Sequence, residues 1–272
     1  MFLKYAALTI TLSLVPFSAL ATETPNNIEA EVIEYKDGDT VLEGYYVPSR
    51  CGDLEESYPT VMVIHQWKGL SGNEKMRAEM LSRQCYNAFA IDMYGKGIRP
   101  TTMEDAAAES NKYKNNPELA LGRMNAALDY LKTRPHVDTE NLAAIGYCFG
   151  GGMALELSRS GADINAAVSH HGTLSSAIDS YDGNDVKAKI LAFHGSADPY
   201  VTQEDVMTFI NEMKDHEITY EFVGYPGVVH SFTQIESGTD ASTGAAYDLD
   251  ADRDSWAQTL RFLDEELNGS EE

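Results

Sequence analysis

A short glycine-rich segment near the middle of the chain sets strict limits on the fold. An apolar run ends in Gly146-Tyr147-Cys148-Phe149-Gly150, and a helical pattern follows at once. This Gly-x-nucleophile-x-Gly pattern between a strand and a helix is typical of a nucleophile elbow, here with cysteine instead of serine. A Cβ at Gly146 or Gly150 would collide with neighbouring backbone in such a turn. The competing interpretations are a buried structural cysteine and a phosphate-binding turn.

The rest of the chain alternates between strand and helix patterns. Alternating residues at 28–35 and 41–47 flank an Asp-Gly-Asp turn and predict an N-terminal antiparallel hairpin. Continuous apolar runs such as Thr60–Ile64 are typical of parallel strands buried on both faces. We expect further strands at 87–93, 166–169, 189–193 and 219–223, and helices at 73–84, 103–132 with a break near Pro117, 203–214 and 252–267. The pattern predicts an α/β fold, a doubly wound and mostly parallel sheet.

The first residues are typical of a secretory signal peptide. Lys4 is their single charge, an apolar run follows to about Phe17, and Ala19-Leu20-Ala21 is a small-x-small cleavage pattern. We therefore expect residues 1–21 to be removed and residues 22–272 to form one domain that is periplasmic or secreted. The apolar run is short for a membrane span, which makes a retained anchor the lesser alternative. No later segment is long and apolar enough to suggest membrane association after cleavage.

The net charge limits what the protein can bind, and the number of cysteines limits how they can pair. The formal charge of −23 argues against binding to nucleic acid or to an anionic membrane surface. Three cysteines in an exported chain leave one unpaired if two bridge, so parity and compartment predict a Cys51–Cys85 disulfide and a free Cys148. The histidines at 65, 170 and 171 have no carboxylate or cysteine at ligand spacing, and we expect neither metal nor cofactor. The oligomeric state stays open, with a monomer favoured.

Three predicted loops at the carboxyl edge of the sheet carry residues suited to acyl transfer. Cys148 follows one strand, Asp198 lies in the loop after the strand at 189–193, and His230 lies in the loop after the strand at 219–223. The order nucleophile, acid, histidine is that of the α/β-hydrolases. In that arrangement Cys148 attacks a carbonyl, His230 moves the proton and Asp198 orients the imidazole.

These motifs resemble the dienelactone hydrolase family. Gly146-Tyr147-Cys148-Phe149-Gly150-Gly151, His194-Gly195-x-x-Asp198 and His230-Ser231-Phe232 carry the resemblance, which runs from about Ile28 to Leu267. This resemblance implies the α/β-hydrolase fold. It also implies a cysteine-dependent hydrolase with the triad Cys148, Asp198 and His230. The resemblance also implies an oxyanion hole from the backbone amides of Trp67 and Phe149.

Three positions differ from the family pattern. Gln66 stands where the family usually has a glutamate that helps to set the charge state of the thiol. Lys96 and Gln234 stand at the positions of two arginines that hold the substrate carboxylate in members that open dienelactones. Lysine offers a point charge in place of a bidentate fork, and glutamine offers no charge. The resemblance therefore assigns Gln66, Lys96 and Gln234 to the substrate site but points away from the dienelactone itself.

The sequence as a whole favours an exported, cofactor-free, cysteine-dependent hydrolase that cleaves a small ester or lactone through an acyl-thioester at Cys148. Lys68, Lys96 and Arg99 are expected at the same sheet edge and favour a substrate with a negative charge. The alternatives are a thioesterase or broad carboxylesterase on the same triad, and a non-catalytic ligand-binding protein that retains the fold. A thiol redox protein is disfavoured, because no Cys-x-x-Cys accompanies Cys148.

Overall fold

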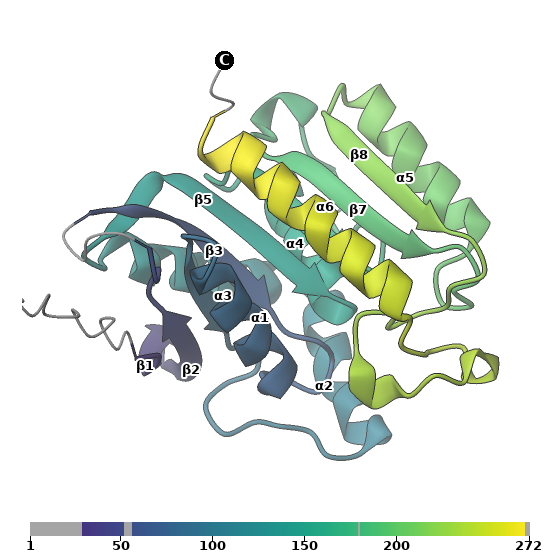
Figure 1. Cartoon of the computed structure of the whole chain (residues 1–272), viewed down its shortest axis with the longest axis horizontal. Coiled ribbons are helices and arrows are strands. Elements are labelled where there is room, and N and C mark those ends of the chain that lie inside the picture. The colour runs from purple at the N-terminus through teal and green to yellow at the C-terminus, as the bar shows by residue number, and fades with distance from the viewer. Residues whose placement is uncertain (1–28, 52–55, 179, 270–272) are drawn as a thin grey trace, which may run out of the picture.

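A single mixed sheet organises the computed structural model (Figure 1), which describes residues 29–51, 56–178 and 180–269. The predicted signal peptide at 1–21 lies outside the described residues. In the described part, eight strands lie in the order β1-β2-β4-β3-β5-β6-β7-β8. They are β1 (Glu31–Asp37), β2 (Thr40–Val47), β3 (Tyr58–Ile64), β4 (Asn87–Ile91), β5 (Val137–Tyr147), β6 (Ala166–His170), β7 (Lys189–Gly195) and β8 (Tyr220–Tyr225).

Pairing in the sheet follows the sequence patterns. β1 pairs antiparallel with β2, and β2 pairs antiparallel with β4. From β4 onward all neighbouring strands are parallel. The predicted mostly parallel sheet with an N-terminal antiparallel hairpin is therefore confirmed. All parallel strands end at one edge, so the loops that follow them lie at the same edge of the sheet.

Helices cover both faces of the sheet. They are α1 (Gly72–Ser82), α2 (Met103–Lys114), α3 (Pro117–Lys132), α4 (Phe149–Arg159), α5 (Gln203–Asp215) and α6 (Leu249–Leu267). The core on one face takes apolar residues from α1 and α6, and the core on the other takes them from α3, α4 and α5. Figure 1 shows α6 lying across the near face of the sheet. In the described ranges no helix is both long and apolar enough to span a membrane.

Capping side chains explain where several helices begin. Asn116 accepts a hydrogen bond from the Leu119 amide, and Pro117 occupies the first turn of α3, which confirms the break expected there. The last helix begins at Leu249, three residues earlier than its apolar periodicity suggests. Asp248 is the reason, because its carboxylate accepts hydrogen bonds from two amides of the first turn of α6.

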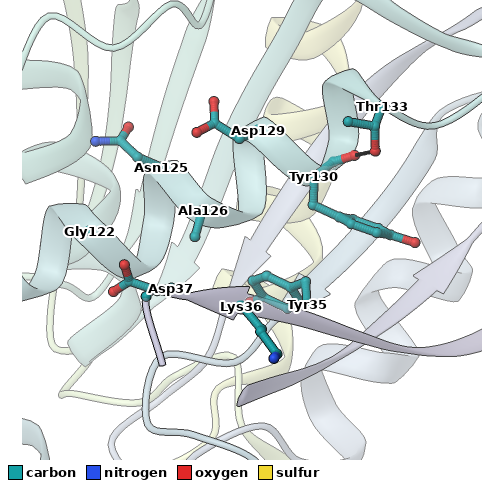
Figure 2. Close-up of a pocket in the computed structure, with 10 residues that line it drawn as sticks. Tyr35, Lys36, Asp37, Gly122, Asn125, Ala126, Asp129, Tyr130 and Thr133 are labelled. Carbon is teal, nitrogen blue, oxygen red and sulfur yellow. Dashed lines mark hydrogen bonds between the residues drawn. The ribbon is translucent and has the colours of Figure 1, made fainter. Parts of the chain in front are cut away.

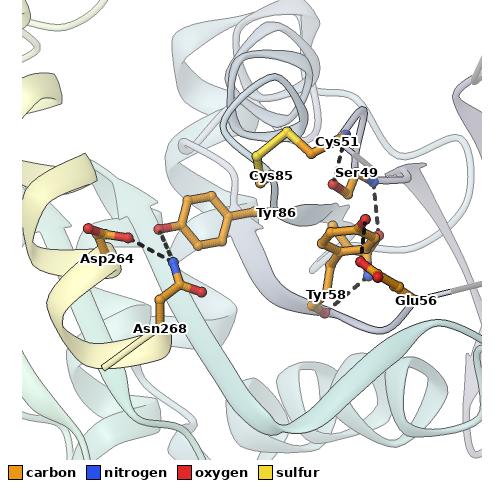
Figure 3. Close-up of a disulfide and its surroundings, with 9 residues drawn as sticks. Ser49, Cys51, Glu56, Tyr58, Cys85, Tyr86, Asp264 and Asn268 are labelled. Atoms are coloured by element: carbon orange, nitrogen blue, oxygen red, sulfur yellow. Dashed lines mark hydrogen bonds between the residues drawn. A yellow bond between two sulfur atoms is a disulfide. The ribbon is translucent and has the colours of Figure 1, made fainter. Parts of the chain in front are cut away.

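A disulfide joins the segment after β2 to the turn between α1 and β4 (Figure 3). Cys51 and Cys85 are bonded with a Cα–Cα distance of 5.0 Å, and they lie 34 residues apart in sequence. Nearby, the Arg50 amide donates to the Ser82 carbonyl at 2.8 Å, which links the segment after β2 to the end of α1 through the backbone. Cys148 is the free cysteine. The structure thus has the pairing expected from parity and leaves one thiol available.

We expect one free thiol per chain when the purified protein is titrated under denaturing, non-reducing conditions. Closing a loop of 34 residues stabilises the fold by roughly 3–4 kcal/mol, because the denatured chain loses conformational entropy. Reduction should therefore lower the melting temperature by several degrees, about 2–4 °C for each kcal/mol. A Cys148→Ala variant is the matched control and should titrate no free thiol. Three free thiols in the untreated protein would contradict the bridge.

Candidate active site

The elbow between β5 and α4 holds Cys148 in a conformation that few residues adopt. Its backbone has φ 55° and ψ −114°, in a sparsely populated region that is typical of strained functional sites. A Cβ added to Gly146 would lie 1.9 Å from the Gly150 oxygen, and one added to Gly150 would lie 2.2 Å from the Ile64 oxygen. Both contacts are impossible for real atoms. The two glycines therefore allow the turn that places the thiol at the sheet edge.

Cys148, His230 and Asp198 form a continuous chain of contacts at this edge. The Nε2 atom of His230 lies 3.1 Å from Cys148 Sγ, and its Nδ1 atom lies 2.7 Å from Asp198 Oδ2. The second carboxylate oxygen of Asp198 accepts from the Tyr200 amide at 2.7 Å. The backbone of His230 is held on both sides, because its N–H donates to the Gly244 carbonyl and its C=O accepts from the Ala246 amide. The three side chains come from the loops after β5, β7 and β8.

The thiol and the imidazole stabilise each other's charged forms. Burial alone would raise the pKa of Cys148, but the charge of His230 and its hydrogen bond outweigh burial and bring this pKa below its ordinary value. Burial alone would lower the pKa of His230, but the Cys148 thiolate and Asp198 raise it to about 10. The interaction between the two groups therefore favours a thiolate beside an imidazolium.

The two backbone amides predicted to form an oxyanion hole belong to the turn after β3 and to the first residue of α4. Phe149 is the first residue of α4, so its N–H has no partner four residues back in the helix. This amide also hydrogen-bonds the Cys148 sulfur and contributes to the lowered pKa of the thiol. Trp67 lies in the turn closed by the hydrogen bond from the Gly69 amide to the Gln66 carbonyl at 3.1 Å. The Tyr94 hydroxyl fixes this turn by donating to the Trp67 carbonyl at 2.9 Å.

The three residues assigned to the substrate site have different surroundings. Gln66 is buried, and its side-chain amide has no hydrogen-bond partner among the described residues. Lys96 lies in the loop after β4, where its ammonium forms an exposed ion pair with Glu34 of β1. Gln234 is half-buried and directly precedes a short 3₁₀ turn. Gln66 thus offers free hydrogen-bonding groups, whereas the charge of Lys96 is already balanced.

Arg99 has a structural role that the sequence pattern did not suggest. Its guanidinium lies 3.4 Å from the buried carboxylate of Asp92 and donates to the Leu70 carbonyl at 2.9 Å. Asp92 in turn accepts from the amides of Tyr94 and Gly95. Arg99 therefore ties the loop after β4 to the loop after β3. Of the three cations expected at this edge, two are engaged by acidic side chains, and Lys68 is exposed.

Two further residues near the triad were missed by sequence analysis. The charge of Lys114, at the end of α2, contributes to lowering the pKa of Cys148. The ring of Tyr200 meets the ring of His230 edge-on at a centroid distance of 5.4 Å, and 63% of Tyr200 is exposed. Tyr200 lies only two residues after Asp198, and this closeness in sequence could have identified it as a neighbour of the site. Lys114 had no such signal, because its position depends on how α2 packs.

An open groove elsewhere on the molecule is separate from these loops (Figure 2). It lies between β1 and α3, and its polar side chains include Lys36, Asp37, Asn125 and Asp129. Cys148, Asp198 and His230 are not among the residues that line it. Among the described residues, no group of three or more histidine, cysteine, aspartate or glutamate side chains is arranged to hold a metal ion.

The sheet, the elbow and the loops after its strands define an α/β-hydrolase. The sequence profile of the dienelactone hydrolase family matches residues 48–267, and the chain belongs to that family. It is therefore a hydrolase that acts on ester or lactone bonds.

Relatives agree with this assignment. The chain is 30% identical to a dienelactone hydrolase-like promiscuous phosphotriesterase from metagenomic libraries, with a TM-score of 0.82 over 88% of this chain and 98% of that one. A mouse carboxymethylenebutenolidase homolog is 26% identical over 69% of this chain and 74% of its own length. An uncharacterized protein of Caenorhabditis elegans is 37% identical over 53% of this chain and 91% of its own length.

Proposed function

We propose that this protein is an exported, cysteine-dependent hydrolase that cleaves small esters or lactones through an acyl-thioester at Cys148. One observation carries the proposal: a single imidazole, that of His230, contacts Cys148 Sγ at 3.1 Å and Asp198 Oδ2 at 2.7 Å. This is the relation of nucleophile, base and orienting acid that acyl transfer requires. Gln66 takes no part in these contacts, which weakens the non-catalytic alternative that rested on it.

The proposed reaction has two halves. The Cys148 thiolate attacks the carbonyl carbon, and the negative charge moves to the carbonyl oxygen, close to the amides of Trp67 and Phe149. As the carbon–oxygen bond to the alcohol breaks, the imidazolium of His230 gives its proton to the departing oxygen. Neutral His230 then removes a proton from water, which attacks the thioester and releases the acid. The thiolate and the imidazolium are restored at the end of the cycle.

Export is supported by the disulfide. The bond between Cys51 and Cys85 is of the kind that persists in oxidising compartments and is rare in the cytosol. The apolar segment before Ala19-Leu20-Ala21 supports the same destination. We therefore propose that residues 22–272 act as one domain in the periplasm or outside the cell.

A broad carboxylesterase is the second candidate, and the surroundings of Lys96 favour it. The family's two-arginine clamp is replaced by Lys96, which is paired with Glu34, and by the uncharged Gln234. A bidentate grip on a substrate carboxylate needs arginine. The exposed ring of Tyr200 beside His230 offers apolar contact area at the mouth of the site instead. Neutral esters and lactones with varied acyl groups would fit this arrangement.

We expect hydrolysis of p-nitrophenyl esters to be active over a broad pH window. The pKa of Cys148 is lowered, so activity should rise below the pH at which an ordinary thiol ionises, about 8.5. The pKa of His230 is raised to about 10, so the imidazolium should persist, and activity should fall only as the pH passes about 10. The measurement is kcat/KM against pH, together with the rate of thiol alkylation.

Two substitutions sharpen this test. Asp198→Asn removes a charge that raises the pKa of His230, so the alkaline limb should move to lower pH. Asp129→Asn, an exposed change in α3 outside the triad loops, is the matched control and should leave the profile unchanged. Alkylation that follows an ordinary thiol pKa in the wild type would refute the ion pair, and with it the proposed mechanism.

A further inference from the structure

A second histidine, outside the proposed triad, is built into the elbow. His171 follows β6, is fully buried and has a left-handed backbone with φ 40°. Its Nδ1 atom lies 3.1 Å from the backbone nitrogen of Cys148, and its Nε2 atom lies 2.8 Å from Thr233 Oγ1. The imidazole therefore bridges the nucleophile's own backbone and the loop that carries His230.

The hydrogen bonds fix one tautomer of this imidazole. The Cys148 amide can only donate, so Nδ1 of His171 must be the unprotonated acceptor. Nε2 then carries the hydrogen and donates to the Thr233 hydroxyl. Burial, followed by the positive charge of His230, holds the pKa of His171 well below the ordinary value, so the ring stays neutral. A protonated ring would lose its acceptor at Nδ1.

Further contacts of His171 and Thr233 hold the two ends of this bridge in place. The His171 ring meets the His230 ring edge-on at a centroid distance of 5.2 Å. The Thr233 carbonyl accepts from Arg77 Nη2 of α1 at 3.3 Å, and the same guanidinium nitrogen lies 2.5 Å from Asp252 of α6. The His230 loop is thus tied through Thr233 to two helices on one side and to the elbow on the other.

We propose that His171 is a positioning residue that sets the spacing between Cys148 and His230. It contacts the strained elbow at the Cys148 amide, which it shares with the His170 carbonyl at 2.9 Å, and it holds the His230 loop through Thr233. When both bonds are present, the thiolate and the imidazolium stay within contact. The proposal rests on the proposed role of Cys148 as nucleophile and adds a residue that acts through the backbone of Cys148 and through the His230 loop.

The neighbouring His170 provides a matched control. It is also buried, but its ring stacks between Tyr147 and Phe193 at centroid distances of 4.7 and 4.9 Å. Its Nε2 atom contacts Thr259 of α6 at 3.1 Å. Its side chain makes no contact with the triad residues in the described structure. A change at His170 perturbs the same buried strand end without breaking the bridge.

The test compares His171→Phe, His171→Asn and Thr233→Val with His170→Phe. Each variant is examined by kcat/KM on an ester, by the pH dependence of Cys148 alkylation and by its melting temperature. We expect His171→Phe to lower kcat/KM about tenfold, because the elbow and the His230 loop lose the imidazole that joins them, although the Cys148 amide keeps its bond to the His170 carbonyl at 2.9 Å. The alkylation profile should shift to higher pH by about one unit as the ion pair weakens. Thr233→Val should shift it in the same direction.

His171→Asn should recover part of the loss, because asparagine tolerates a left-handed backbone and its oxygen can accept from the Cys148 amide. His170→Phe should leave the alkylation profile unchanged. An alkylation profile for folded Thr233→Val that matches the wild type would overturn the proposal, even if His171→Phe does not fold. Alkylation reports on the thiol without any substrate. Failure of the proposed function itself would appear separately, as hydrolysis that survives Cys148→Ala.

Discussion

Cys148→Ala is expected to abolish ester hydrolysis while leaving the fold intact. The substitution removes the sulfur that lies 3.1 Å from His230 and keeps a Cβ that the elbow already accommodates. Loss of a nucleophile from a triad lowers kcat by about a million-fold in the best-studied case. Unfolding stability should change by less than about 1 kcal/mol, because no large apolar group is removed. The measurements are turnover on p-nitrophenyl and lactone esters and a thermal melt.

Alkylation provides an independent control for this result. Cys51 and Cys85 are bonded to each other, so iodoacetamide should modify the native protein at Cys148 alone. Inactivation should follow modification with one group added per chain, as measured by mass. Turnover that persists in Cys148→Ala, or after complete alkylation of the wild type, would rule out the thiol mechanism.

Gly146→Ala is expected to prevent folding or to lower the free energy of unfolding by more than about 4 kcal/mol. The new Cβ would lie 1.9 Å from the backbone oxygen of Gly150, and no rotation of a side chain can relieve this clash, because a Cβ is fixed by its own backbone and its neighbour here is a backbone atom. Gly72→Ala is the matched control. A Cβ there has no atom within 4 Å. Gly72 is the first residue of α1, where alanine is favourable.

The prediction is tested by the soluble yield, thermal melting and urea unfolding of both variants. A Gly146→Ala protein as stable as the wild type would mean that the elbow can relax. The same result would remove the physical reason for placing Cys148 on a strained turn.

Local sterics and sheet geometry explain why much of this molecule could be predicted from its sequence. The need for Gly146 and Gly150 follows from the turn itself, and the loops of Asp198 and His230 lie near Cys148 because parallel strands end at one edge. The N-terminal hairpin follows from two alternating runs around a short turn.

Contacts that depend on how distant elements pack could not be predicted. The pairing of Lys96 with Glu34 requires the register of β1 beside the loop after β4. The bridge through His171 requires the His230 loop to fold back over the end of β6. Each of these joins residues more than 60 positions apart, and neither has a repeating pattern in the sequence. The role of Arg99 in linking two loops was hidden for the same reason.

The position of the disulfide along the chain has a consequence for how the protein matures. Three cysteines can form three different pairs, and two of these would consume the thiol of Cys148. In the proposed exported chain, translocation delivers the N-terminal part first, so Cys51 and Cys85 enter the oxidising compartment before Cys148 does. The correct pair, only 34 residues apart, has time to close before a competing thiol arrives. If the chain is exported as proposed, the thiol of Cys148 therefore arrives when its two possible partners can already be bonded to each other.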